Sequence, residues 1–225
     1  MQTKKTTLLL IKILEKIVSD KDLHGLWLNT LSFLEYIGTR KMLKALPASC
    51  LNETLLAHIN EESRHSLFFK KLSHKVSGKQ FCFAEHEMIC SKEAETYFQQ
   101  IDKEATSFSR SNPILNYLYT TYTVELRAIL LYSIYSKILK RNEFPFTLNF
   151  VLKEEEQHLA AVMQSIKTLD PFAEQNFEEL KEFEHRAYFS LLRKLEQKIF
   201  HPSTSKAKDL SQASNSSVSF QEQHP

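Results

Sequence analysis

The sequence predicts an all-α protein built around a four-helix bundle, and three observations support this. With 42% hydrophobic residues, 25% charged residues and only 3 Gly, the composition suits helices far better than a turn-rich β fold. Prolines, which cannot continue a helix, fall between segments of helical periodicity. Glutamates and histidines recur at intervals close to the length of a helix, a turn and part of an antiparallel return. The interrupting prolines are Pro47, Pro113, Pro145, Pro171 and Pro202.

The first half of the chain divides into four expected helices. Residues 4–19 form an amphipathic helix with Leu8, Ile11, Leu14 and Ile17 on one stripe, expected to pack outside the bundle. A second helix, 22–45, stops before Pro47. The third helix, 52–77, begins at an Asn N-cap and ends at a glycine. Segment 84–107 has few apolar residues, so we expect a mostly solvated helix in a long crossover.

The second half contains three more expected helices and a tail. Asn112-Pro113 is an N-cap followed by proline at the first helical position, which opens a helix over 112–140. A helix over 147–168 follows Phe144-Pro145, and Asp170-Pro171 repeats the signal of a capping residue followed by proline before a final helix over 172–200. We expect residues 1–200 to form one domain, with its core in 20–170, and the polar residues 201–225 to be a disordered tail.

Charge and cysteine usage exclude several classes of protein. A formal charge of +2 and a pI near 8.3 are too mild to indicate a nucleic-acid-binding protein. The three cysteines are odd in number and include no Cys-x-x-Cys pair, so neither a disulfide framework nor a zinc knuckle is indicated. No apolar stretch approaches the 18 or so residues of a membrane span. We therefore expect a soluble cytoplasmic protein with no nucleic-acid or membrane partner.

A lone Glu followed by Glu-x-x-His occurs twice and predicts a metal centre. Glu and His three residues apart lie on one helix face and can bind one ion. The intervals along the chain are 27 residues, then 60, then 30, which is the rhythm of two helical hairpins joined by a long crossover. Four carboxylates balance the charge of two divalent ions, and each imidazole adds a nitrogen ligand. The six candidate ligands are Glu35, Glu62, His65, Glu125, Glu155 and His158.

The number of Glu-x-x-His matches expected by chance shows how informative this pattern is. With 22 Glu and 9 His in 225 residues, about one Glu-x-x-His is expected at random (9 × 22/225 ≈ 0.9), and three occur. The third, Glu182 with His185, lacks an upstream Glu at hairpin distance, so we expect it not to bind metal.

Apolar neighbours strengthen the prediction for the two lone glutamates. Glu35 and Glu125 both lie in strongly apolar segments, and a buried carboxylate must be paired or bind a metal. The alternative is ion pairing of Glu125 with Arg127 or Arg64, and of Glu35 with Arg40.

Further residues are candidates for supporting roles. Glu61 and Glu154 each precede a candidate ligand and are placed to orient the imidazole of the opposite pair, or are simply solvated. His58, four residues before Glu62, is an extra ligand, a residue that supports one, or a hydrogen-bonded core histidine, and Arg64 is a further supporting candidate. Candidates for lining a substrate cavity, which could equally be core residues, are Tyr36, Gly38, Phe69, Tyr122 and Tyr132.

These six positions, in this order, resemble the ferritin-like di-iron carboxylate superfamily over residues 20–170. Glu61-Glu62-Ser-Arg-His65 is also similar to the Glu-Glu-x-Arg-His of acyl-carrier desaturases. The resemblance implies two iron ions, with manganese or a mixed pair as alternatives. It implies that Glu35, His65 and bridging Glu62 serve one ion, and that Glu125, His158 and bridging Glu155 serve the other.

Differences between this sequence and individual members of that superfamily narrow the range of expected functions. Phe69 stands where a ribonucleotide reductase subunit would have its radical tyrosine, and Val151 stands where arylamine oxygenases carry a further histidine. Storage ferritins usually have a shorter crossover. We therefore expect an oxidase or oxygenase that uses dioxygen and an external reductant on a small, largely apolar organic substrate, with homodimerisation left open. The alternatives are a ferroxidase and a non-catalytic bundle used as an interaction module.

Overall fold

A computed structural model describes residues 2–201, and within this range every regular element is helical. The predicted tail lies outside the described residues. Two short 3₁₀ helices, η1 (Ala48–Cys50) and η2 (Glu85–Glu87), accompany seven α-helices. These are α1 (Gln2–Val18), α2 (Lys21–Ala45), α3 (Glu53–Ser77), α4 (Ser91–Phe108), α5 (Pro113–Arg141), α6 (Asn149–Leu169) and α7 (Ala173–Phe200).

Several helix ends follow the capping residues expected from the sequence. The side chain of Asn52 accepts a hydrogen bond from the backbone N–H of Leu55 at the start of α3. Gly78 ends α3 in the left-handed conformation, with φ of 73°. Asn112 caps α5, and Pro113 occupies its first turn.

Asp170 was wrongly expected to cap the last helix. It ends α6 instead, and α7 begins three residues later, without a side-chain cap. One carboxylate oxygen of Asp170 accepts the backbone N–H of Phe172 at 3.0 Å, and the other accepts the hydroxyl of Tyr119 at 2.6 Å. The carboxylate thus fixes the turn between α6 and α7 against α5.

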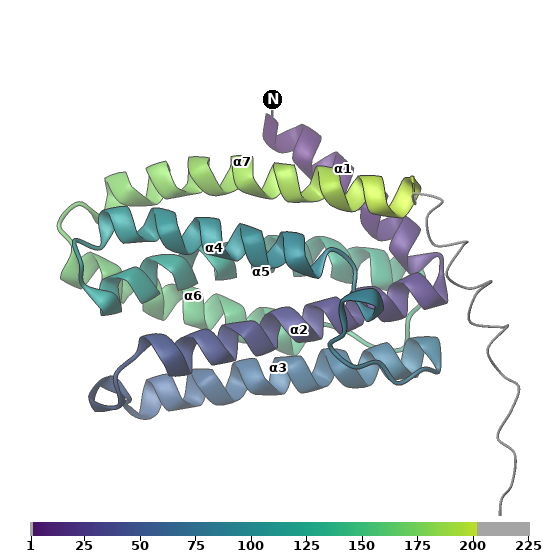
Figure 1. The fold of residues 1–225 in the computed structure, drawn as a ribbon, viewed down its shortest axis with the longest axis horizontal. Coiled ribbons are helices and arrows are strands. Elements are labelled where there is room, and N and C mark those ends of the chain that lie inside the picture. The colour runs from purple at the N-terminus through teal and green to yellow at the C-terminus, as the bar shows by residue number, and fades with distance from the viewer. Residues whose placement is uncertain (1, 202–225) are drawn as a thin grey trace, which may run out of the picture.

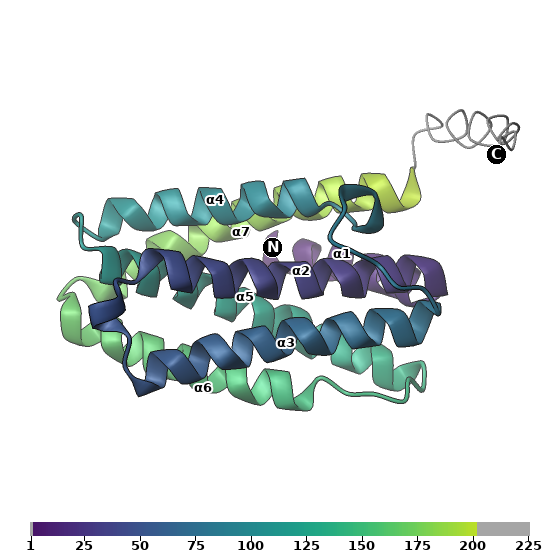
Figure 2. The ribbon, with the colours of Figure 1, turned by 60° about the horizontal axis from the view of Figure 1, so that its bottom comes forward.

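The axes of the long helices lie roughly parallel to one another (Figures 1 and 2). Helix α2 packs along α3, and α5 packs along α6, with further contacts of α2 with α5 and of α3 with α6. Helices α4 and α7 lie on the side of α2 and α5 that is opposite to α3 and α6 (Figure 2). The helices that carry the candidate ligands therefore enclose a common interior, and the crossover helix covers one side.

Helix α1 is more deeply packed than the sequence indicated. It contacts α7, α2 and α5, and its buried residues include Leu10, Ile13, Leu14 and Ile17. The predicted stripe was wrong at Leu8, which is 57% exposed. Because α1 contacts three helices, its buried face is wider than the predicted stripe and is centred on different residues.

The expectation of a mostly solvated crossover helix was also wrong. Residues 82–90 form an irregular segment around η2, and α4 begins only at Ser91. Its residues Tyr97, Ile101 and Ala105 are buried, spaced three or four apart as one helix face requires. Helix α4 packs through this face on α5 and α7.

Among the described residues, none of the helices has a segment both long and apolar enough to cross a lipid bilayer.

Candidate metal centre

All six predicted ligands meet in the interior, and a seventh residue, His58, lies among them. Four helices supply them: α2, α3, α5 and α6. Every one of the seven side chains is buried. They form two groups in which the donor atoms all lie within 4.8 Å of one another. The first group is Glu35, Glu62, His65 and Glu155, and the second is His58, Glu62, Glu125 and His158.

The first group is rich in carboxylates. Nδ1 of His65 lies 3.2 Å from Oε1 of Glu155, and the buried hydroxyl of Tyr132 donates a hydrogen bond to Glu35. Burial, reinforced by the charge of Glu62, raises the pKa of Glu35 to about 8. Burial alone would lower the pKa of His65, but the close contact with Glu155 and the charges of the surrounding carboxylates outweigh burial and raise the pKa to about 9.

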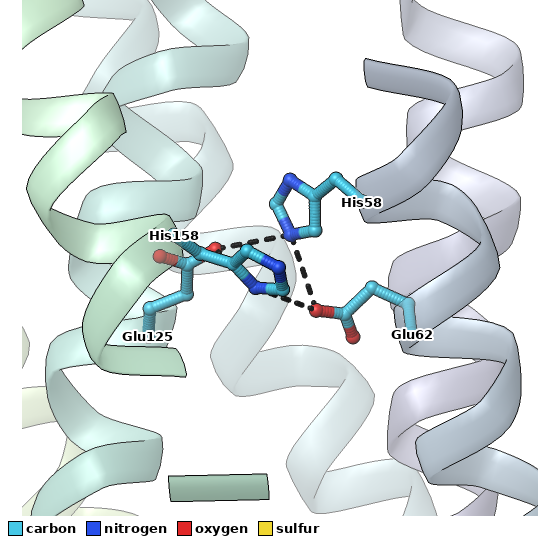
Figure 3. Close-up of side chains that lie close together, drawn as sticks. All are labelled: His58, Glu62, Glu125 and His158. Atoms are coloured by element: carbon cyan, nitrogen blue, oxygen red, sulfur yellow. Dashed lines mark hydrogen bonds and ion pairs between the residues drawn. The ribbon is translucent and has the colours of Figure 1, made fainter. Parts of the chain in front are cut away.

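The second group contains two imidazoles, as Figure 3 shows. Nε2 of His58 lies 3.2 Å from Oε1 of Glu62 and 3.2 Å from Oε1 of Glu125. Nδ1 of His158 lies 3.8 Å and 3.9 Å from the same two oxygens. The two rings lie close together, with centroids 3.8 Å apart. Four donors from α3, α5 and α6 thus converge on one point.

Electrostatics in the second group follow from burial and from the charges that face each other. Burial raises the pKa of Glu125 to about 8. Burial opposes protonation of His58, but its close contacts and charge interactions with Glu125 and Glu62 outweigh burial and raise its pKa to about 10. Burial and then the charge of His58 lower the pKa of His158 to about 4, so its ring is neutral near pH 7.

The outward nitrogens of the two predicted histidine ligands are held by carboxylates from the opposite hairpin. Nε2 of His65 donates to Glu154 at 2.8 Å, and Nε2 of His158 donates to Glu61 at 2.6 Å. Arg64 in turn lies 2.7 Å from the other oxygen of Glu154. These carboxylates therefore direct both Nδ1 atoms inward, which is the arrangement that the sequence predicted for them.

The polar atoms that face inward fit a metal centre. Within the described part of the chain, Nδ1 of His65, Nδ1 of His158 and both carboxylate oxygens of Glu125 are buried without a hydrogen-bond partner. Such groups carry a large desolvation penalty unless a cation lies between them. Carboxylate oxygens and imidazole nitrogens at these spacings suit divalent ions such as iron and manganese. The buried His and Glu groups can hold metal.

The arginines named as alternative partners lie elsewhere. Arg127 donates to Glu184 on α7, with Nε 2.7 Å from Oε1, and Arg64 pairs with Glu154. Arg40 lies over the ring of Tyr36, 5.6 Å from its centroid. None of these ion-pair alternatives for the two lone glutamates is therefore found among the described side chains.

The third Glu-x-x-His lies outside the centre. Glu182 is exposed, and Nε2 of His185 is 3.3 Å from Oγ1 of Thr6 on α1. Neither residue belongs to the two buried groups. The two Glu-x-x-His motifs that contribute to the buried groups are thus the two that have an upstream Glu at hairpin distance.

Three of the five cavity candidates lie at the centre. Tyr132 contacts Glu35, and the ring of Phe69, which is fully buried, lies 5.4 Å from the Tyr132 ring. Gly38 faces Glu62: beyond its own helix, a Cβ placed there would meet only Oε2 of Glu62, at 3.6 Å. Gly38 is also partly exposed.

The other two candidates, Tyr36 and Tyr122, lie away from the centre. Tyr36 is 40% exposed and stacks on Phe83, with ring centroids 5.6 Å apart. It follows Glu35 directly, so it points about 100° away around the helix. Tyr122 packs against Phe177 of α7 at 4.4 Å. Tyr117 places its hydroxyl 3.5 Å from Nδ1 of His58.

No protein-family model, curated protein or solved structure matches this chain. Its interpretation therefore depends on the residues of the centre themselves.

Proposed function

We propose that α2, α3, α5 and α6 form a ferritin-like four-helix bundle, and that the protein is a non-haem di-iron oxidase or oxygenase. It would use dioxygen to oxidise a small, largely apolar organic substrate. The observation that carries the proposal is the pair of buried, inward-facing Nδ1 atoms of His65 and His158. In each histidine, a carboxylate from the other helical hairpin (α2 with α3, or α5 with α6) binds Nε2. Nδ1 therefore faces the cluster of four buried glutamates.

The protein side chains would hold two ions in a defined geometry. Glu62 belongs to both groups and would serve both ions, and Glu155 lies near both candidate ligand histidines, at 3.2 Å from Nδ1 of His65 and 4.0 Å from Nδ1 of His158. When bound, two iron(II) ions supply electrons for the reduction of dioxygen, which no protein side chain could do. Manganese, alone or paired with iron, is the alternative metal.

Residues beside the ligands would position and shield the reaction. Tyr132 holds the Glu35 carboxylate by its hydrogen bond, and Phe69 packs on the Tyr132 ring, so this side of the centre is closed to water. Gly38 presents no side chain toward Glu62, and small molecules would reach Glu62 past this position. The apolar character of Phe69 favours an apolar substrate.

The electron balance requires a reductant. Reduction of dioxygen to the level of water takes four electrons, and oxidation of an organic substrate by one oxygen atom or one desaturation supplies two. An external donor must supply the other two. We therefore propose a reductant as a partner of the reaction.

Anaerobic reconstitution tests the proposal. Chelator-treated protein should bind about two iron(II) ions per chain and then consume dioxygen in a reaction that depends on reductant and substrate. Glu62→Ala and His158→Ala should abolish both properties, while Glu156→Gln, an exposed neighbour on α6, should leave both unchanged.

Three other outcomes would overturn the proposal. Failure to bind two ions tightly would exclude the metal centre. Turnover of many iron atoms per chain, together with a cage-sized assembly in size-exclusion chromatography, would indicate a ferroxidase. Intact cellular function in the two ligand variants would indicate an interaction module.

A further inference from the structure

His58 lies where a metal ligand of the second group would lie. It precedes Glu62 by four residues on α3, so the two side chains share one helix face. Two donors about 2.1 Å from one ion lie about 3.0–3.4 Å apart when their bonds diverge by 90–110°. The 3.2 Å distances from Nε2 of His58 to Glu62 and Glu125 fall within this range. The distances from Nδ1 of His158, 3.8 Å and 3.9 Å, need only a small contraction.

Hydrogen bonding alone accounts poorly for this arrangement. His58 contacts the carboxylates of both Glu62 and Glu125. Even so, neither carboxylate oxygen of Glu125 has a hydrogen-bond partner in the described structure. Nδ1 of His158 is also unpartnered, although it faces the same two oxygens. Figure 3 shows the two rings converging on one pair of carboxylates from different helices. A shared ion satisfies all four groups at once.

We propose that His58 is a seventh protein ligand and that the centre therefore offers two unlike metal positions. The inference rests on the proposed metal centre but goes beyond its six predicted ligands. The first position has three carboxylates and one imidazole, whereas the second has two carboxylates and two imidazoles, with Glu62 common to both.

The unlike donor sets give the two positions different metal preferences. Imidazole nitrogen favours later divalent ions, and manganese(II) stands lowest in the stability order for nitrogen ligands. Oxygen-rich sites tolerate manganese(II) well. We therefore expect the second position to select cobalt(II), iron(II) or zinc(II) over manganese(II), and the first position to discriminate less.

The asymmetry has a basis in the sequence. His58 stands four residues before the Glu of the first Glu-x-x-His, and the corresponding position of the second motif is Val151. Val151 is fully buried and apolar. The second hairpin therefore supplies no equivalent of His58 to the first position.

Cobalt(II) substitution provides a direct test. In cobalt(II)-loaded protein, each ligated histidine with a remaining N–H gives a strongly shifted, solvent-exchangeable proton signal. Three such signals are expected, from His58, His65 and His158. In His58→Ala, one signal should disappear, and one of two cobalt(II) equivalents should bind at least about tenfold more weakly. His58→Gln, which keeps a polar side chain, should show the same changes.

Matched controls separate ligation from effects on folding. His74→Ala, at an exposed position on the same helix, should retain all three signals and both affinities. Circular dichroism of the metal-free variants monitors the fold. With one equivalent each of cobalt(II) and manganese(II) per chain, the wild type should bind cobalt(II) in the second position and manganese(II) in the first, and His58→Ala should lose this selectivity.

The outcomes distinguish this inference from the proposed function. Wild-type protein that binds two cobalt(II) ions but shows only two histidine signals would overturn the role of His58 alone, with no variant needed. Unchanged cobalt(II) affinities and spectra in His58→Ala would do the same. Wild-type protein that binds no cobalt(II), manganese(II) or iron(II) would overturn both.

Discussion

Replacement of Glu125 by Gln should stabilise the metal-free protein and weaken the metal-bound one. Glu125 is buried, and neither of its carboxylate oxygens has a hydrogen-bond partner among the described residues. Burial raises its pKa to about 8, from an ordinary value of 4.5. The folded state therefore holds a proton that the unfolded state has already released between these two pH values, so the free energy of unfolding falls as pH rises through this window.

The magnitude follows from the size of this shift. Each pH unit between 4.5 and 8 corresponds to about 1.4 kcal/mol, which gives a cost of roughly 3 kcal/mol at pH 7. A neutral amide does not titrate and avoids this cost, but it also removes a charged partner of His58. We therefore expect Glu125→Gln to stabilise the metal-free protein by about 2–3 kcal/mol at pH 7 and by almost nothing near pH 5.

Urea unfolding followed by circular dichroism, in the presence of a chelator at pH 5, 6, 7 and 8, measures this effect. Glu156→Gln is the matched control, because Glu156 is an exposed residue of α6 that directly follows the candidate ligand Glu155. With iron(II) or cobalt(II) present, the sign should reverse, since a ligand is lost. Destabilisation of the metal-free protein at pH 7, or a gain that does not grow with pH, would show that Glu125 is a structural partner and not a strained metal ligand.

Three further substitutions test other parts of the structure. Glu154→Gln, which weakens the hold on His65, should lower metal affinity about 10- to 100-fold in a chelator competition while the melting temperature of the metal-free protein changes little. Gly38→Ala should raise stability in urea by about 0.5–1 kcal/mol, as expected in a helix interior, but slow dioxygen consumption, and unchanged turnover would exclude the proposed route. Tyr119→Phe should cost about 1–3 kcal/mol in thermal unfolding because buried Asp170 loses a donor, and an unchanged midpoint would contradict this.

The ligands could be predicted from the sequence because their information is local. A Glu-x-x-His lies on one helix face whatever surrounds it, and hairpin intervals bring two such faces together. The adjacent glutamates, Glu61 and Glu154, were predictable for the same reason. Tyr132 also had a local signal, since it follows Glu125 by seven residues and therefore lies on the same face two turns later.

Other features depend on how helices pack and could not be predicted. The four-residue spacing of His58 and Glu62 was visible, but only the approach of α5 and α6 shows that Glu125 and His158 meet His58. The burial of α1 and α4 likewise depends on α7, whose position no periodicity specifies. Residue spacing thus predicts which side chains share a helix face, but it does not predict which helices lie next to one another.

The crossed hydrogen bonds, from His65 to Glu154 and from His158 to Glu61, have a consequence for how the protein unfolds. Each ligand histidine is oriented by the hairpin to which it does not belong, so separation of the hairpins disorders both histidines together. Metal release should then be an all-or-none event that coincides with undocking of the hairpins, even where the individual helices persist. A bound metal would therefore report on tertiary structure, and its loss would mark the first cooperative step of unfolding.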